Sequence, residues 1–71
     1  MLNKMSFEEK VVYIAGLTMP ERCKVGFTNG TLFVEECHPR DAILLESRLL
    51  NVLDCGIILS RFGNTSAFDF V

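Results

Sequence analysis

The sequence has no long apolar run and no cluster of basic residues. No stretch of its 71 residues approaches the roughly eighteen apolar residues of a membrane-spanning helix. Seven Lys and Arg stand against nine Asp and Glu, and the basic residues are scattered along the chain. Nucleic-acid affinity depends largely on clustered cations that neutralise phosphates, so this distribution argues against a DNA or RNA partner. We therefore expect a protein that neither enters a membrane nor binds nucleic acid.

The chain has three cysteines and a single histidine. The three cysteines cannot form a complete disulfide set, and the first residues lack the apolar region of a signal peptide, which together favour reduced thiols and a cytoplasmic protein. Structural zinc sites need four ligands in short paired spacings, and these cysteines and the one histidine offer none. No glycine-rich phosphate loop is present. We expect no metal and no cofactor.

Cys37 and His38 are the one adjacent pair of residues that could act as nucleophile or ligand. They fall where a strand is expected to meet a helix, and a helix N-terminus can lower a thiol pKa. A nucleophilic cysteine also needs a base held by tertiary structure, and neighbours on an extended backbone point apart. We therefore favour a structural role for both residues and a protein that is not an enzyme.

The clearest structural pattern is Asn29-Gly30 between two β-rich runs. A type I′ turn needs positive φ at both central residues, which Asn and Gly tolerate, so the pair predicts a hairpin with a two-residue loop. The expected cross-strand pairs are Lys24 with Glu35, Val25 with Val34, Gly26 with Phe33, Phe27 with Leu32, and Thr28 with Thr31. Alternation then gives the hairpin one apolar face and one mostly polar face.

A helix is predicted from Pro39 to about Asp54. Pro39 suits the first helical turn and biases His38 toward extended backbone, while Gly56 is the expected stop. The stripe expected to be buried comprises Ala42, Leu45, Leu49, Val52 and Leu53, widened by Ile43 and Leu50. Leu44 lies on the polar side and Glu46 at the shoulder of the stripe, which suggests that both face a partner surface.

The N-terminal part predicts a further helix. Ser6 and Glu9 match a capping box, and Gly16 is expected to end the element at about Ala15. The run Val11–Ile14 is also good strand sequence, so both alternatives stand for residues 6–15. Residues 1–5 are expected to be loosely packed.

The C-terminal part predicts a second hairpin, with strands at residues 57–62 and 65–70 around Gly63-Asn64. One face is strongly apolar. The reverse face carries Ile58, Phe62 and Ala67, an apolar group of the kind that marks a protein interface when exposed. The alternative is that the first helix or the N-terminus covers these residues.

These elements assemble as an α+β protein, a single domain over residues 1–71 in the order helix, hairpin, helix, hairpin (αββαββ). We expect a four-stranded antiparallel sheet packed on the central helix, although two separate two-stranded ribbons are an alternative. Open edge strands of such a sheet would pair readily with another subunit.

Size and apolarity predict the function class. A chain of 71 residues that is 49% hydrophobic has too small an interior for its apolar side chains, so association is expected to cover the remainder. The first hypothesis is a small protein-interaction module that forms a homo-oligomer. Its candidate interface residues are Leu44, Glu46, Ile58, Phe62 and Ala67. The alternative is a ligand-sensing domain with a small-molecule pocket between sheet and helix or between subunits.

Overall fold

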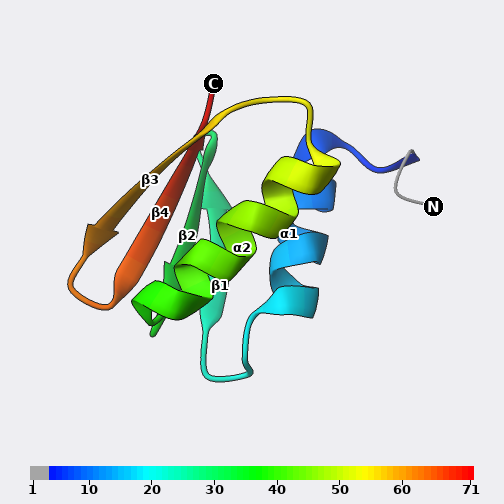
Figure 1. The fold of residues 1–71 in the computed structure, drawn as a ribbon. Helices are drawn as coiled ribbons and strands as arrows, with labels where there is room; N and C mark the ends of the chain where they lie inside the picture. Colours follow the sequence, from blue (N-terminus) through cyan, green and yellow to red (C-terminus); the bar gives the residue numbers. More distant parts are fainter. Residues whose placement is uncertain (1–3) are drawn as a thin grey trace.

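The computed structural model describes residues 4–71. It shows an α+β fold with two helices and one four-stranded antiparallel sheet (Figure 1). The elements are α1 (Phe7–Thr18), β1 (Lys24–Thr28), β2 (Thr31–Glu35), α2 (Pro39–Val52), β3 (Ile57–Phe62) and β4 (Thr65–Phe70). Of residues 1–5, which the sequence predicts to be loosely packed, residues 1–3 lie outside the described part.

Helix α1 begins at the predicted capping box. The Ser6 hydroxyl accepts a hydrogen bond from the Glu9 N–H at 3.2 Å, and the Glu9 carboxylate accepts one from the Ser6 N–H at 2.8 Å. The strand alternative for residues 6–15 is therefore wrong. The expectation that Gly16 ends the helix is also wrong, because α1 continues to Thr18 and stops where Met19, which precedes Pro20, is extended.

The first hairpin has the register that its turn predicts. Asn29 and Gly30 have φ of 50° and 81°, as a type I′ turn requires. The observed pairs run from Lys24 with Glu35 to Thr28 with Thr31. After β2 the chain turns through Glu36, a non-glycine residue with φ of 57°, and this kink redirects the backbone toward α2.

Helix α2 ends two residues earlier than predicted. Its last residue is Val52, and Leu53 is extended with its N–H bonded to the Leu49 carbonyl. Gly56 is not a helix cap: its N–H and C=O form two hydrogen bonds of 3.0 Å with Val71, so it extends the pairing of β3 with β4. A side chain at this position would approach the Val71 Cγ2 to 3.0 Å, which explains why glycine suits the site.

The two hairpins form one sheet in the order β1-β2-β4-β3. The joint lies between β2 and β4, where Leu32 is opposite Phe68 and Phe33 is opposite Ala67. Strands β1 and β3 are consequently the two edges. The alternative of two separate ribbons is wrong.

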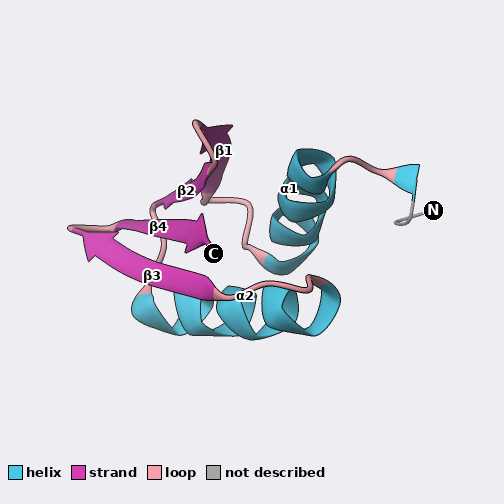
Figure 2. Cartoon of the chain, turned by 90° about the horizontal axis from the view of Figure 1, so that it is seen from above, coloured by secondary structure: helices cyan, strands magenta, loops and turns pink. Residues whose placement is uncertain are grey.

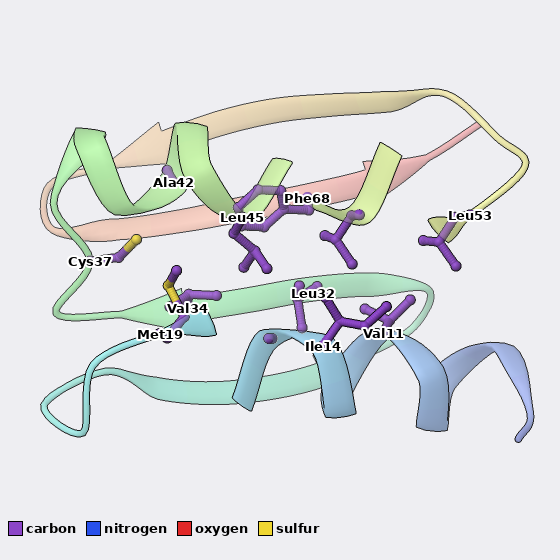
Figure 3. Close-up of a cluster of buried hydrophobic side chains, with 12 residues drawn as sticks. Val11, Ile14, Met19, Leu32, Val34, Cys37, Ala42, Leu45, Leu53 and Phe68 are labelled. Atoms are coloured by element: carbon purple, nitrogen blue, oxygen red, sulfur yellow. The ribbon is translucent and has the colours of Figure 1, made fainter. Parts of the chain in front are cut away.

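The core lies between one face of the sheet and both helices (Figure 3). Its fully buried side chains come from α1, β2, α2 and β4, and include Val11, Leu32, Leu45, Leu49 and Phe68. Helix α2 packs along β3 and β4, while α1 packs against β1 and α2 (Figure 2). The opposite face of the sheet carries no helix in the described part of the chain.

Candidate interaction surface

The surface that the fold leaves uncovered is centred on β3. This strand pairs with β4 alone, so its second side is an open edge. On the sheet face without helices, Ile58 is 54% exposed and Phe62 is 66% exposed. Large apolar side chains on an open edge strand are a combination that monomeric proteins usually avoid. The predicted interface residues Ile58 and Phe62 thus lie on one strand and one face.

Ala67 does not share this exposure. It is 4% exposed, so the expectation that it belongs to an exposed patch is wrong. Ala67 lies on the central strand β4, between Phe33 of β2 and Ser60 of β3, so it has a neighbouring strand on each side. Phe33, by contrast, is 38% exposed and extends the apolar area across the sheet.

The flank of α2 that faces away from α1 adds further apolar surface beside β3. Ile43 and Leu50, seven residues apart, are exposed on this flank with the half-buried Glu46 between them. The sequence predicts both apolar residues, and also Val52, to be buried; all three expectations are wrong. Ile43 and Leu50 are uncovered because no element lies beyond β3 to cover this side of α2 in residues 4–71. Val52 lies on the opposite flank, at the groove between α2 and α1.

Leu44 lies on the other flank of α2. It shares a helix face with Arg48 and Asn51, which line a groove against Tyr13 and Leu17 of α1. Leu44 is half exposed, as its position on the polar side predicts. Of the five candidate residues, the structure therefore places Ile58, Phe62 and Glu46 around β3, buries Ala67, and separates Leu44 from the rest.

Arg61 anchors the end of β3. Its side chain lies on the helix-facing side of the sheet and donates to the Cys37 carbonyl at 2.9 Å and to the hydroxyl of the fully buried Ser66 at 2.8 Å. The Cys37 N–H in turn donates to the Asn64 carbonyl at 2.8 Å. These bonds tie the β3–β4 turn to the start of α2. This end of the edge strand is consequently held in place by the chain's own hydrogen bonds.

Comparison with protein-family models, with curated proteins and with solved structures found no match. No helix in residues 4–71 has the length and apolarity needed to cross a membrane.

Cys37 and His38 lie at the β2–α2 junction as predicted. The Cys37 side chain is 1% exposed and its thiol donates to the His38 carbonyl at 3.5 Å. Nearby, burial and secondly the neighbouring Cys37 raise the pKa of the Cys23 thiol. This thiol donates a hydrogen bond to the Glu36 carbonyl at 3.3 Å. Both thiols thus bond to backbone carbonyls. Within residues 4–71, no three His, Cys, Asp or Glu side chains are grouped as metal ligands.

A second exposed feature is an aromatic cleft at the opposite end of the sheet from Arg61. The Phe7 ring meets Phe70 edge-on with centroids 5.1 Å apart, and Phe27 stacks on Phe70 at 6.3 Å. The half-buried Cys55 also lines this cleft. The sequence did not indicate the cleft, because its three rings come from α1, β1 and β4 and meet only in the folded chain.

Proposed function

We propose that this protein is a non-enzymatic protein-interaction module that acts as a homo-oligomer. One observation supports the proposal above all: the open edge strand β3 carries the uncovered apolar side chains Ile58 and Phe62 on one face, and the exposed Ile43 and Leu50 of α2 lie beside it on the other. Exposed apolar area of this kind marks protein interfaces. A second copy of the chain would cover it without any additional component.

Charge agrees with this proposal. The edge strand carries a single charged residue, Arg61, and its guanidinium already donates to groups of its own chain. Interface centres are depleted in charged residues and enriched in aromatic ones, and the surface around β3 has this composition. The strand β3 itself therefore offers a partner no free charge to desolvate, and Glu46 of α2 is a charged neighbour of the surface.

Analytical ultracentrifugation tests the proposal. The 8.0 kDa chain is expected to sediment as an assembly at micromolar concentration and to dissociate on dilution. Sedimentation as an 8.0 kDa species up to about 100 µM, where even weak specific complexes form, would contradict it.

The aromatic cleft supports a second candidate function, small-molecule sensing. Phe7, Phe27 and Phe70 offer ring faces and edges to a flat apolar ligand, and Ser6 and Glu8 add polar groups at the rim. A ligand that binds the folded state raises the unfolding midpoint, so a thermal-shift screen with aromatic metabolites tests this function. Phe70→Leu should abolish any shift that arises in the cleft. A shift that persists in this variant would place the ligand elsewhere.

A further inference from the structure

The backbone hydrogen bonds of β3 determine which of its groups face outward. Gly56 and Val71 exchange two hydrogen bonds, and they continue the register in which Ile57 is opposite Phe70. Antiparallel pairs alternate between hydrogen-bonded and non-hydrogen-bonded, so every second residue after Gly56 bonds to β4. The residues whose N–H and C=O groups point away from β4 are Ile57, Leu59 and Arg61. The open edge therefore presents a regular row of donors and acceptors.

We propose that β3 pairs antiparallel with β3 of a second copy about a two-fold axis at Ser60, so that the two sheets become one. This inference rests on the proposed function and specifies its geometry. In this register Leu59 is opposite Arg61 of the second copy, and each of the two such pairs exchanges two backbone hydrogen bonds. The joined sheet contains four strands from each copy, and all four helices lie on the same side of it.

The exposed side chains favour this register. Ile58 meets Phe62 of the second copy, and because the axis passes through Ser60 the contact occurs twice. These are non-hydrogen-bonded pairs, in which side chains approach most closely. The small Ser60 side chains face each other between the two apolar contacts. An axis at Leu59 would instead place Ile58 opposite Ser60 and Phe62 opposite Gly56, and would leave both large side chains without an apolar partner.

The outward face of β3 is complementary to itself, which favours a second copy of the chain as the binding partner. The sequence Ile58-x-Ser60-x-Phe62 is apolar at both ends and small at the centre, so a two-fold axis brings unlike apolar ends together. Arg61, the one charged residue of β3, faces Leu59 of the second copy, so the paired strands do not oppose like charges. The exposed α2 side chains Ile43 and Leu50 lie beside the same edge and would approach the second copy above the joined strands.

A disulfide at the axis tests the geometry. In a non-hydrogen-bonded pair the Cα atoms lie about 4.5 Å apart, which suits a disulfide, so the Ser60→Cys variant should cross-link to its own copy under mild oxidation. Gly26→Cys is the matched control. Gly26 lies in the same row across the sheet but on the β1 edge, and nothing lies within 4 Å of where its Cβ would be. Mass spectrometry of the non-reduced dimer separates the new disulfide from any formed by the native cysteines.

Cross-linking at position 60 should be at least about tenfold faster than at position 26, because only the first pair is pre-aligned. Amide exchange in the wild-type chain gives an independent measurement. The Leu59 and Arg61 amides should be protected at high protein concentration and lose that protection on dilution. This second measurement decides the question if the Ser60→Cys variant fails to fold.

Three outcomes overturn the geometry. One is an assembled chain with equal cross-linking at positions 26 and 60 and unprotected Leu59 and Arg61 amides; the proposed function would then survive with another interface. Another is faster cross-linking between an Ile58→Cys copy and a Ser60→Cys copy than between two Ser60→Cys copies, which would move the axis to Leu59. The third is a chain that remains monomeric at all concentrations, and this result would remove the proposed function as well.

Discussion

The two edges of the sheet are protected to different degrees. Strand β1 has five residues, carries Lys24 at one end, and packs against α1. Its face away from the helices shows Lys24, Gly26 and Thr28, none of them large and apolar. Strand β3 has six residues, and its corresponding face shows Ile58 and Phe62. A helix packs on one face of each edge strand, so the helices do not distinguish the two edges. Short length and lysine are usual means of blocking unwanted strand pairing, and β1 is the shorter strand and carries Lys24.

The helix that precedes each edge strand adds to the difference. Helix α1 precedes β1 directly and packs back onto it, and the Phe7 ring reaches Phe27 with centroids 6.5 Å apart. Helix α2 likewise precedes β3 and packs against it, but α2 has no aromatic side chain that could reach the edge strand in this way. The two edges therefore differ both in length and in the side chains that flank them.

The largest expected effect is a loss of stability on changing the core between the two edges. Phe68 is fully buried on β4, opposite Leu32 on one side and Leu59 on the other, so it supports both hairpins. Phe68→Ala should lower the free energy of unfolding by about 3–5 kcal/mol, measured by urea denaturation at low protein concentration. The control is Phe62→Ala, the same change at an exposed site, expected to cost no more than about 0.5 kcal/mol in the monomer. Equal losses in both variants would show that Phe62 is covered within the monomer.

The next effect separates the two edges. Replacing Ile58 and Phe62 together by lysine places like charges opposite each other across the two-fold axis. This should raise the dimer Kd by about 100-fold or more, because opposed charges cost several kcal/mol at an interface. Both side chains are exposed, so the monomer should keep its circular dichroism spectrum. Thr28→Lys on the β1 edge is the matched control, and its Kd should match that of the wild type. An unchanged Kd in the double variant would exclude β3 from the interface.

A smaller effect concerns the protection of β1. Ser6→Ala removes the side-chain half of the capping box and should cost about 1 kcal/mol of stability. Because α1 packs against β1 and not against β3, amide exchange should accelerate more at Gly26 and Thr28 than at Ile58. Ser47→Ala, an exposed change in the middle of α2, removes a hydroxyl without removing a cap and should be close to neutral. Uniform acceleration over both edges in Ser6→Ala would mean that α1 protects the sheet as a whole.

Local patterns predicted most of the fold. The capping box at Ser6, the Asn29-Gly30 turn and Pro39 each act on adjacent residues, and each defines an element or a register in the structure. The joining of the hairpins between β2 and β4 depends on contacts distant in sequence. That joint determines which strands are edges and so which side chains stay uncovered.

The candidate surface was predicted in part for the same reason. Ile58 and Phe62 are exposed because they lie on an edge strand, whereas Ala67 shares their face but lies on a central strand. Alternation gives the face of a residue but not the neighbours of its strand. The prediction that Ile43 and Leu50 are buried was wrong for a related reason. A helical wheel shows which residues share a face of the helix, but not how far the sheet extends beneath that face. Here the sheet ends at β3.

The smallest expected effect is a pH dependence of the stability of the α1 N-terminus, which packs on the β1 side of the sheet. The pKa of the exposed Glu9 carboxylate is lowered from its ordinary value of 4.5. The larger cause is the hydrogen bond from the Ser6 N–H, and the smaller is a hydrogen bond with the Ser6 hydroxyl. The folded state thus favours ionised Glu9. Its contribution is present above the unfolded-state pKa and is lost as the pH falls through the lower folded-state pKa.

Acid should consequently loosen the α1 N-terminus, and with it β1, before β3. Amide exchange or NMR shifts recorded from pH 6 down to pH 3 measure this order. Glu9→Gln should remove the acid-dependent step at α1, whereas Glu8→Gln keeps the capping box intact and should retain the step. If β3 loosened first in the wild-type chain, the α1 cap would not be what protects the β1 edge. The contrast between the two edges would then need another cause.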